Sequence, residues 1–497
     1  MTLSNEAVVA KAAQRCRELG IVIPTFAQQK DPGLIPQKIK DRLGHVGMWD
    51  VNPANLFRIT WKNEPVARGG GFNHGNWIEF PSSLTGVPAR IVGLLGKHFP
   101  TGAHKVGAAF ACLVPRLVTG QFDPTRQKAV WPSTGNYCRG GAFDCAVLGC
   151  TAVAILPEGM SRERFEWLKS IGAEVIATPG CESNVKEIYD KCWEIRRTRP
   201  DCVIFNQFEE FGNAIWHYHV TGGVIDEIFN SLNQNPDRQR AGAAASQPGS
   251  LRLAGYISAT GSGGTIAAGD FLRTKHPHIR VVAVEAQQCP TLYNCGFGDH
   301  RIEGIGDKHV PWIHNVRNTD VVAAIDDEQC ISLMRLFNED AGRSMLEKSG
   351  VPRSTVDGLG DLGISGICNV VAAIKTAKHF EMTERDVIML PLTDSMELYG
   401  SRIEEYRKER GPYDAMRAAG DRARYLEGTA TDWLRELTYT DRKALHNFKY
   451  FTWVEQQQRK VEDLRRLWDP DFWTEQFGQV EEWDRKIEAF NREVGTA

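Results

Sequence analysis

The chain has 497 residues, of which 42% are hydrophobic and 24% are charged, and its formal net charge at pH 7 is −3. This length allows two or three domains with substantial cores, and the composition is that of an ordinary soluble globular protein. The small net charge and the absence of an extended basic stripe argue against a nucleic-acid or anionic membrane partner.

The N-terminal segment, "MTLSNEAVVAKAAQRCREL", carries charges throughout and has no apolar signal-peptide core. No part of the sequence approaches the roughly 18 uninterrupted apolar residues of a membrane-spanning helix. Twelve cysteines are scattered from Cys16 to Cys368 without a CxxC pair, which is typical of reduced thiols. We therefore expect a cytoplasmic protein with no metal site and no membrane segment.

From about residue 127 to residue 285, short β-rich runs alternate with helical patterns. Strands are predicted at 128–133, 151–156, 174–178, 201–206, 251–260, 280–286 and 386–392. Helices are predicted between them at 138–149, 161–172, 185–197 and 265–275, and the polar segment 233–250 is predicted as a surface loop. This alternation predicts an α/β fold with two doubly wound parallel-sheet lobes, and a crevice between them where such sheets bind ligands.

Beyond about residue 406 the chain becomes charged, helical and rich in tryptophan. The tryptophans of this part are Trp433, Trp453, Trp468, Trp473 and Trp483. We interpret it as an amphipathic extension whose aromatic face packs on the core or on another subunit. A ligand-binding or regulatory module is the alternative.

A lone lysine, Lys105, stands in "HFPTGAHKVGAAF" directly before an apolar run of mostly small residues. Burial at the edge of an apolar crevice lowers the pKa of an amine and leaves more of it as the free base. We expect the small residues after Lys105 to leave room for a cofactor ring at the start of the helix.

Two turns between a strand and a helix offer anion sites. In "GSGGT" (Gly261–Thr265), glycines let backbone N–H groups converge at a helix N-terminus and form a phosphate cradle, although tight packing alone would also explain them. In "STGN", Ser133, Thr134, Gly135 and Asn136 offer donors to a carboxylate, or form a plain helix cap. An amine facing a phosphate cradle suits an aldehyde cofactor, pyridoxal 5'-phosphate.

Six motifs carry a family resemblance: "PTGAHKVGAAF", "STGN", "NQFEEFGNAIWHYHVTGG", "GSGGT", "HRIEGIGD" and "LTDSMELYGSR". In this order, over residues 54–405, the sequence resembles fold-type II pyridoxal-phosphate enzymes of the cysteine synthase and cystathionine β-synthase family. The lysine motif also resembles that of tryptophan synthase β subunits. The resemblance implies the tryptophan synthase β-like fold, pyridoxal phosphate as cofactor and a homodimer.

The resemblance implies a role for each matching residue. Lys105 would form the Schiff base and remove the Cα proton, and Asn136 would bond the ring hydroxyl of the cofactor. The phosphate would lie on Gly261, Ser262, Gly263, Gly264 and Thr265. The substrate carboxylate would lie on Ser133, Thr134, Gly135 and Gln207, with Gly304 lining the substrate space.

Ser395 would face the pyridine nitrogen, because its spacing to Tyr399 matches the family pattern. A serine hydroxyl leaves that nitrogen unprotonated and favours loss of a β-substituent, whereas an aspartate favours transamination or racemisation. Asp394 is adjacent, so a shift of one position would reverse this argument.

The sequence departs from the family at several positions. Arg139 follows where a small apolar residue is common, and is interpreted either as a solvated helix residue or as a clamp on an acidic β-substituent or acceptor of the substrate. About fifteen extra residues lie within 346–363. The predicted parts are an N-terminal extension (1–54), a small lobe (55–222), a large lobe (223–405) and a Trp-rich helical extension (406–497).

The implied reaction is β-replacement on a small amino acid, in which an activated serine reacts with sulfide or a thiol through an aminoacrylate intermediate. β-Elimination by a cysteine desulfhydrase or an ammonia-lyase is the alternative, since the aminoacrylate is common to both. A non-catalytic scaffold of the same fold is a second alternative, against which Lys105, the phosphate turn and Ser395 argue.

Overall fold

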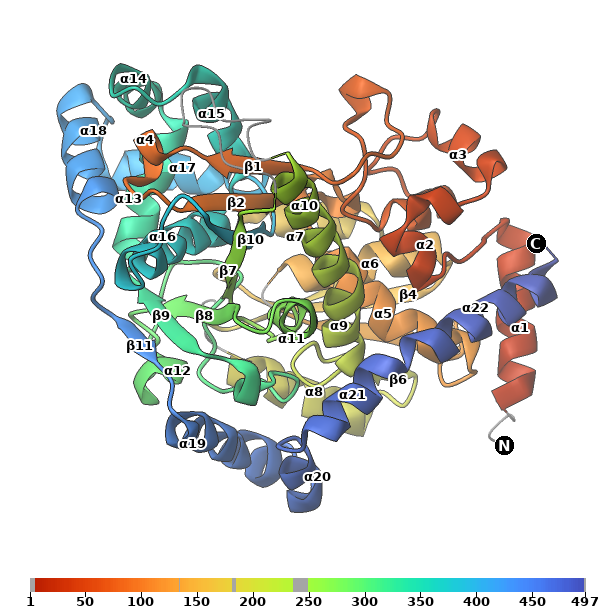
Figure 1. Ribbon diagram of the computed structural model, residues 1–497. Helices are drawn as coiled ribbons and strands as arrows, with labels where there is room; N and C mark the ends of the chain where they lie inside the picture. Colours follow the sequence, from red (N-terminus) through yellow and green to blue (C-terminus); the bar gives the residue numbers. More distant parts are fainter. Residues whose placement is uncertain (1–4, 134, 181–184, 236–248, 496–497) are drawn as a thin grey trace.

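The computed structural model describes residues 5–133, 135–180, 185–235 and 249–495, and it contains two β-sheets (Figure 1). The larger sheet has seven strands in the order β1-β2-β10-β7-β8-β9-β11. Their bounds are β1 (Trp77–Phe80), β2 (Arg90–Leu95), β10 (Asp386–Leu392), β7 (Arg252–Ala259), β8 (Arg280–Ala286), β9 (Val321–Ile325) and β11 (Leu434–Glu436). The smaller sheet has the order β5-β4-β3-β6, with β5 (Glu174–Thr178), β4 (Thr151–Pro157), β3 (Lys128–Pro132) and β6 (Cys202–Ile204).

The smaller sheet is parallel throughout, and the larger sheet is parallel except where β1 and β11 pair antiparallel at its two edges. Both faces of the larger sheet are buried. Along β8, Val281 and Ala283 belong to the hydrophobic core on one face, whereas Val282 and Val284 belong to the core on the other. These features confirm the predicted α/β fold with helices on both faces of parallel sheets.

The helices that follow the N-terminus are α1 (Asn5–Leu19), α2 (Phe26–Lys30), α3 (Gln37–Leu43) and α4 (Ser82–Thr85). Those between β2 and β7 are α5 (Lys105–Val118), α6 (Asn136–Val147), α7 (Arg162–Ser170), α8 (Val185–Thr198), α9 (Phe211–Trp216) and α10 (Gly222–Gln234). Those between β7 and β10 are α11 (Ala267–Lys275), α12 (Thr291–Asn294), α13 (Asp327–Asn338), α14 (Asp340–Lys348), α15 (Arg353–Gly358) and α16 (Ile364–His379). The C-terminal helices are α17 (Gly400–Arg410), α18 (Ala415–Asp421), α19 (Tyr439–Lys449), α20 (Val461–Arg466), α21 (Pro470–Gly478) and α22 (Val480–Val494).

We call the seven-stranded sheet with its helices the large lobe, and the four-stranded sheet with its helices the small lobe. Strand β1 pairs with β2, and β2 pairs with β10 in the larger sheet, although residues 55–222 are predicted to lie together in the small lobe. The pairing of β2 with β10 joins segments about 300 residues apart, and local sequence patterns do not report such partners. The predicted surface loop at 233–250 lies mostly outside the described residues.

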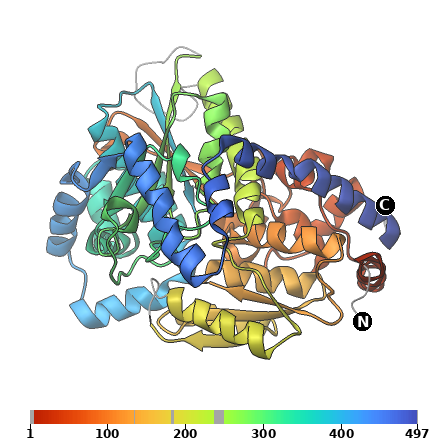
Figure 2. The same cartoon turned by 90° about the horizontal axis from the view of Figure 1, so that it is seen from below.

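The C-terminal extension packs on both lobes of its own chain (Figures 1 and 2). Its strand β11 adds to the edge of the large sheet beside β9. Its last helix, α22, packs against α1 and α5, and the Asp484 carboxylate accepts hydrogen bonds from the backbone N–H groups of Phe26 and Ala27 at 2.6 and 3.0 Å. Trp453 and Trp473 are buried in the core. In the structure, the aromatic side chains Trp453 and Trp473 thus pack on the core, as predicted.

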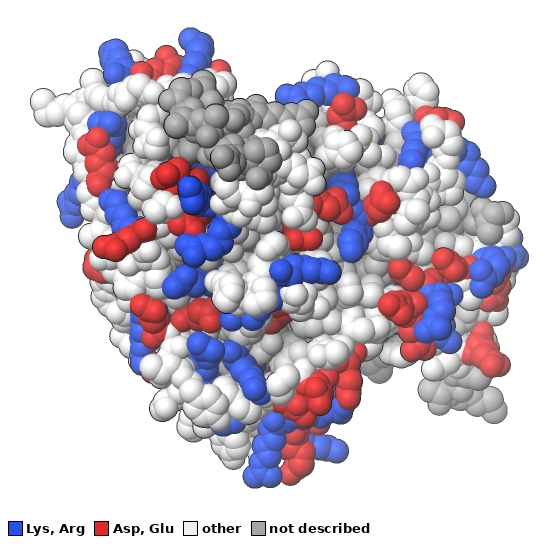
Figure 3. Space-filling model, viewed as in Figure 1, with Lys and Arg blue, Asp and Glu red and all other residues white. Residues whose placement is uncertain are grey.

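Positive and negative side chains are interspersed over the face seen in Figure 3, and neither sign dominates it. In the described part of the chain, every helix is too short or too polar to cross a bilayer.

Candidate active site

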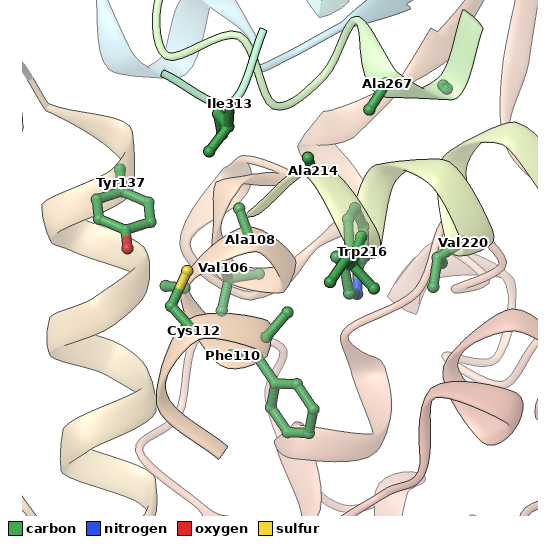
Figure 4. Close-up of a cluster of buried hydrophobic side chains, with 14 of the residues drawn as sticks. Val106, Ala108, Phe110, Cys112, Tyr137, Ala214, Trp216, Val220, Ala267 and Ile313 are labelled. Atoms are coloured by element: carbon green, nitrogen blue, oxygen red, sulfur yellow. The ribbon is translucent and has the colours of Figure 1, made fainter. Parts of the chain in front are cut away.

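Lys105 is the first residue of helix α5, and the rest of this helix is almost fully buried. The turn before it places Thr101 at φ 70° and Gly102 at φ 69°. A Cβ atom at Gly107 would lie 2.2 Å from the Trp216 indole, so this glycine lets α9 pack against α5 (Figure 4). Gly107 thus makes room for a neighbouring helix, and the expectation that the small residues after Lys105 leave room for a cofactor ring stays a prediction.

The glycine turn Gly261–Thr265 connects β7 to α11, as predicted, and it faces Lys105. The Ser262 hydroxyl oxygen accepts hydrogen bonds from Lys105 Nζ at 3.0 Å and from Asn213 Nδ2 at 2.9 Å. Gly263 has φ 75°, which a residue with a side chain rarely adopts. The lysine and the turn, 157 residues apart in sequence, therefore form one site.

Gly264 is enclosed more tightly than its neighbours, and a Cβ atom there would lie 1.9 Å from Asn213 Oδ1. We expect Gly264→Ala to displace Asn213 and the Ser262 hydroxyl, since overpacking of this kind costs about 1–3 kcal/mol. Affinity for pyridoxal phosphate should fall at least about tenfold, measured by titrating the apoprotein. Gly420→Ala is the control, because a Cβ at Gly420 meets nothing within 4 Å. Unchanged affinity in Gly264→Ala would contradict the assignment of this turn.

The cavity between Lys105 and the turn has a volume of about 30 Å³. Predicted residues on its wall are Lys105, Ser133, Asn136, Gln207, Gly261, Ser262, Gly263, Thr265 and Gly304. Gly264 and Gly135 are not on this wall; a Cβ at Gly135 would lie 2.7 Å from Arg164 Nη1. Thr134 lies outside the described residues. The structure thus gathers most of the predicted residues around one cavity.

The neighbouring residues Asp394 and Ser395 have different surroundings. Asp394 Oδ2 accepts hydrogen bonds from Asn136 Nδ2 at 2.6 Å and from the Tyr399 hydroxyl at 2.9 Å, and burial raises the pKa of Asp394. Ser395 is buried, and its hydroxyl has no hydrogen-bond partner among the described residues. Ser395 is not on the cavity wall, where Thr393 lies instead. Protein groups thus hold Asp394 Oδ2, whereas Asp394 Oδ1 and the Ser395 hydroxyl have no hydrogen-bond partner among the described residues.

One carboxylic acid of the cavity wall has no predicted role: Asp307, the last residue of "HRIEGIGD". It is buried, and its Oδ2 accepts no hydrogen bond from the described chain. Burial raises the pKa of Asp307 to about 7, although the charge of Lys105 opposes the shift. Its position directly after a Gly-x-Gly turn was the available signal, but the sequence does not show that this carboxyl faces Lys105's cavity.

The two lobes meet beside the cavity through a buried ion-pair network. Glu303 pairs with Arg164 of α7 at 2.5 Å and with Arg402 of α17 at 2.6 Å, and Arg164 also donates to the Tyr399 hydroxyl at 3.1 Å. Arg164 and Glu303 are almost completely buried. Glu303 therefore connects the small lobe to the segment that carries Asp394.

We expect Glu303→Gln to lower the free energy of unfolding by about 3 kcal/mol, because removing one partner leaves the buried Arg164 charge uncompensated. Urea-induced unfolding measures this change. The control is Glu405→Gln, which removes the more exposed carboxylate paired with Arg402. Equal stability of the two variants would show that the Arg164–Glu303 pair contributes little.

Arg139 is buried, so its interpretation as a solvated helix residue is wrong. Its guanidinium lies 5.4 Å from the Trp49 ring and 4.7 Å from the Trp167 ring. Nε and Nη1 find no acceptor among the residues that the structure describes, and burial together with the nearby Arg164 charge lowers the pKa of Arg139 to about 10. Arg139 is not on the wall of the cavity described above.

Known proteins resemble this chain in sequence and in fold. Residues 85–356 match the family described as pyridoxal-phosphate dependent enzyme. Cystathionine β-synthase of Saccharomyces cerevisiae is 25% identical over 378 residues, which cover 74% of this chain and 68% of the yeast protein. Cysteine synthase B of Campylobacter jejuni is 30% identical over 301 residues, covering 60% and 86% of the two chains. The solved structure of a cysteine synthase from Entamoeba histolytica has a TM-score of 0.55 and 20% identity, and covers 70% of this chain and 92% of its own.

The fold together with the family match defines a fold-type II pyridoxal-phosphate enzyme. The chain belongs to the pyridoxal-phosphate dependent enzyme family, in the group of cysteine synthase and cystathionine β-synthase. Its residues fit the cofactor: the glycine turn forms a cradle that a Cβ at Gly264 would disrupt, and the buried Ser395 hydroxyl has no protein partner in the described chain.

Proposed function

We propose that this enzyme catalyses β-replacement on a small amino acid, with an activated serine as substrate and sulfide or a thiol as nucleophile. β-Elimination, as by a cysteine desulfhydrase or an ammonia-lyase, is the second candidate. The observation that carries the proposal is the engagement of Asp394 by Asn136 and Tyr399. This engagement supports the assignment of the neutral Ser395 hydroxyl, rather than Asp394, to the pyridine nitrogen, and such a partner would favour loss of a β-substituent over transamination.

Pyridoxal phosphate, when bound, supplies an electron sink conjugated with the substrate Cα. Lys105 would form the covalent bond to the cofactor's aldehyde carbon and, once displaced by the substrate amine, take the Cα proton on Nζ. Gly261–Thr265 would hold the phosphate, and Ser133, Thr134, Gly135 and Gln207 would hold the substrate carboxylate. Asn136, fixed by Asp394 through one N–H, keeps a second N–H for the ring hydroxyl.

Asp307 would be the second acid–base group, on the same cavity wall as Lys105. As a carboxylate it would take the proton of the incoming thiol or water, and as a carboxylic acid it would give a proton to the leaving group. Arg139 as a clamp on an acidic substrate group stays a prediction; its buried guanidinium lacks a described acceptor, which supports an anionic partner.

The test offers the holoenzyme O-acetylserine, serine or cysteine and measures pyruvate with and without added sulfide. In a replacement enzyme, sulfide suppresses pyruvate and cysteine accumulates from O-acetylserine. Pyruvate formation that sulfide leaves unchanged favours elimination, and no turnover of any amino acid favours a non-catalytic scaffold. The predicted homodimer and cytoplasmic location also stay predictions, and light scattering after gel filtration tests the first.

A further inference from the structure

The loop that follows Asp307 lies against the back of the glycine turn. A Cβ atom placed at Gly263 would lie 2.9 Å from His314 Cβ and 3.2 Å from Pro311 Cβ. The same loop is tied to the cavity wall on its other side, because the Ile313 N–H donates to the Phe208 carbonyl at 3.3 Å. The position of residues 310–314 therefore limits where the glycine turn can lie.

The C-terminal extension holds this loop by three hydrogen bonds to alternate carbonyl groups. Lys449 Nζ donates to the Trp312 carbonyl at 2.9 Å and to the His314 carbonyl at 2.7 Å. Trp453 Nε1 donates to the Val310 carbonyl at 2.8 Å. We call Lys449, Trp453 and their three acceptor carbonyls the C-terminal brace.

The brace is buried and polar, and the burial of polar groups carries a free-energy penalty of desolvation. Lys449 and Trp453 are 1% and 0% exposed. Lys449 makes no ion pair in the described part of the chain, and burial lowers its pKa to about 7. An apolar side chain at this position would avoid that penalty but leave two carbonyls without a donor. The brace therefore fixes one conformation of the loop, because only that conformation satisfies these carbonyls.

Apolar contacts also link the loop 310–314 to the active site. The Trp453 ring lies 5.9 Å from the Trp312 ring. Ile313, between the two carbonyls that Lys449 binds, belongs to the hydrophobic core that contains Val106 and Ala108 of α5, the helix that begins at Lys105 (Figure 4). Displacement of the loop would thus disturb both the glycine turn and the packing around α5.

We propose that Lys449 and Trp453 are positioning residues for the cofactor phosphate, acting through residues 310–314 on the glycine turn. The C-terminal extension is then part of the cofactor site although it does not touch the cavity. This inference rests on the proposed role of Gly261–Thr265 as the phosphate site.

The test compares Lys449→Met with Lys443→Met in the full-length holoenzyme. Lys443 lies on the same helix, α19, and its Nζ lies 4.2 Å from the Trp468 ring, away from the loop. We measure the phosphorus-31 resonance of bound pyridoxal phosphate and the dissociation constant of the cofactor. In Lys449→Met the resonance should shift and the dissociation constant should rise about tenfold, whereas Lys443→Met should match the wild type within about twofold.

Trp453→Phe removes the indole N–H donor together with part of the buried ring, and it is used if Lys449→Met does not fold. It should move both readouts in the same direction by a smaller amount. A variant that unfolds at lower temperature but keeps the wild-type resonance and affinity overturns the inference, because its role is then only structural. Gly264→Ala separates the two assignments. If Gly264→Ala leaves the phosphorus resonance unchanged, the assignment of Gly261–Thr265 as the phosphate site is wrong. If Gly264→Ala shifts the resonance and Lys449→Met does not, the phosphate site stands and only the positioning role of the C-terminal brace is wrong.

Discussion

Lys105→Ala should abolish the visible absorption band of the holoenzyme and reduce turnover by at least about 10³-fold, because the same amine binds the cofactor and moves the Cα proton. Lys105 Nζ lies 3.0 Å from the Ser262 hydroxyl, in the turn assigned to the phosphate, so the cofactor's two anchors are adjacent. The measurement is an absorption spectrum of the purified variant after saturation with pyridoxal phosphate.

Borohydride treatment of the wild type followed by peptide mass spectrometry should find the cofactor on Lys105. The matched control is Lys97→Ala, eight residues earlier, whose Nζ pairs with Asp361 at 2.6 Å outside the cavity. This variant should keep the band. A band that persists in Lys105→Ala, or a label on another lysine, would disprove the assignment.

Asp307→Asn should lower kcat by about 10²-fold or more and remove a pH dependence centred near pH 7. Burial raises the pKa of Asp307 to about 7, so the carboxyl is protonated below that pH and ionised above it. If the carboxylate is the base, the wild-type rate falls as the pH drops through 7, since the protonated form cannot accept a proton. Asparagine keeps the shape but never ionises, so the variant's rate should show no such fall.

Asp299→Asn is the matched control for Asp307→Asn. Asp299 lies in the same loop region, is exposed, and pairs with Lys308 at 2.9 Å. Its profile should match that of the wild type. Cofactor spectra of both variants should also match the wild type, which excludes loss of pyridoxal phosphate as the cause. An unchanged acid limb in Asp307→Asn would assign the limb to another group.

The sequence predicted the parts of the fold that local periodicity determines. The strands at 174–178, 280–286 and 386–392 match β5, β8 and β10 residue for residue. Lys105 and Gly261–Thr265 could be found in the same way, because each follows a local rule about lysines beside apolar helices or glycines between a strand and a helix.

What the sequence did not predict depends on contacts between distant segments. The burial of Arg139 needs Trp49 from the N-terminal extension and Trp167 from α7. The role of Gly107 needs Trp216, more than 100 residues away. The environment of Asp307 needs Lys105 on another element, and periodicity contains no information about which charges meet across a cavity.

The attachment of the C-terminal extension to both lobes has a consequence for movement. The chain leaves the large sheet at β11 and ends in α22 against α1 and α5, so the extension spans the boundary between the lobes like a strap. Any hinge motion that widened the cavity by separating the lobes would have to stretch this strap or release one of its ends. A hinge motion of this kind would therefore be mechanically coupled to a segment that does not line the cavity.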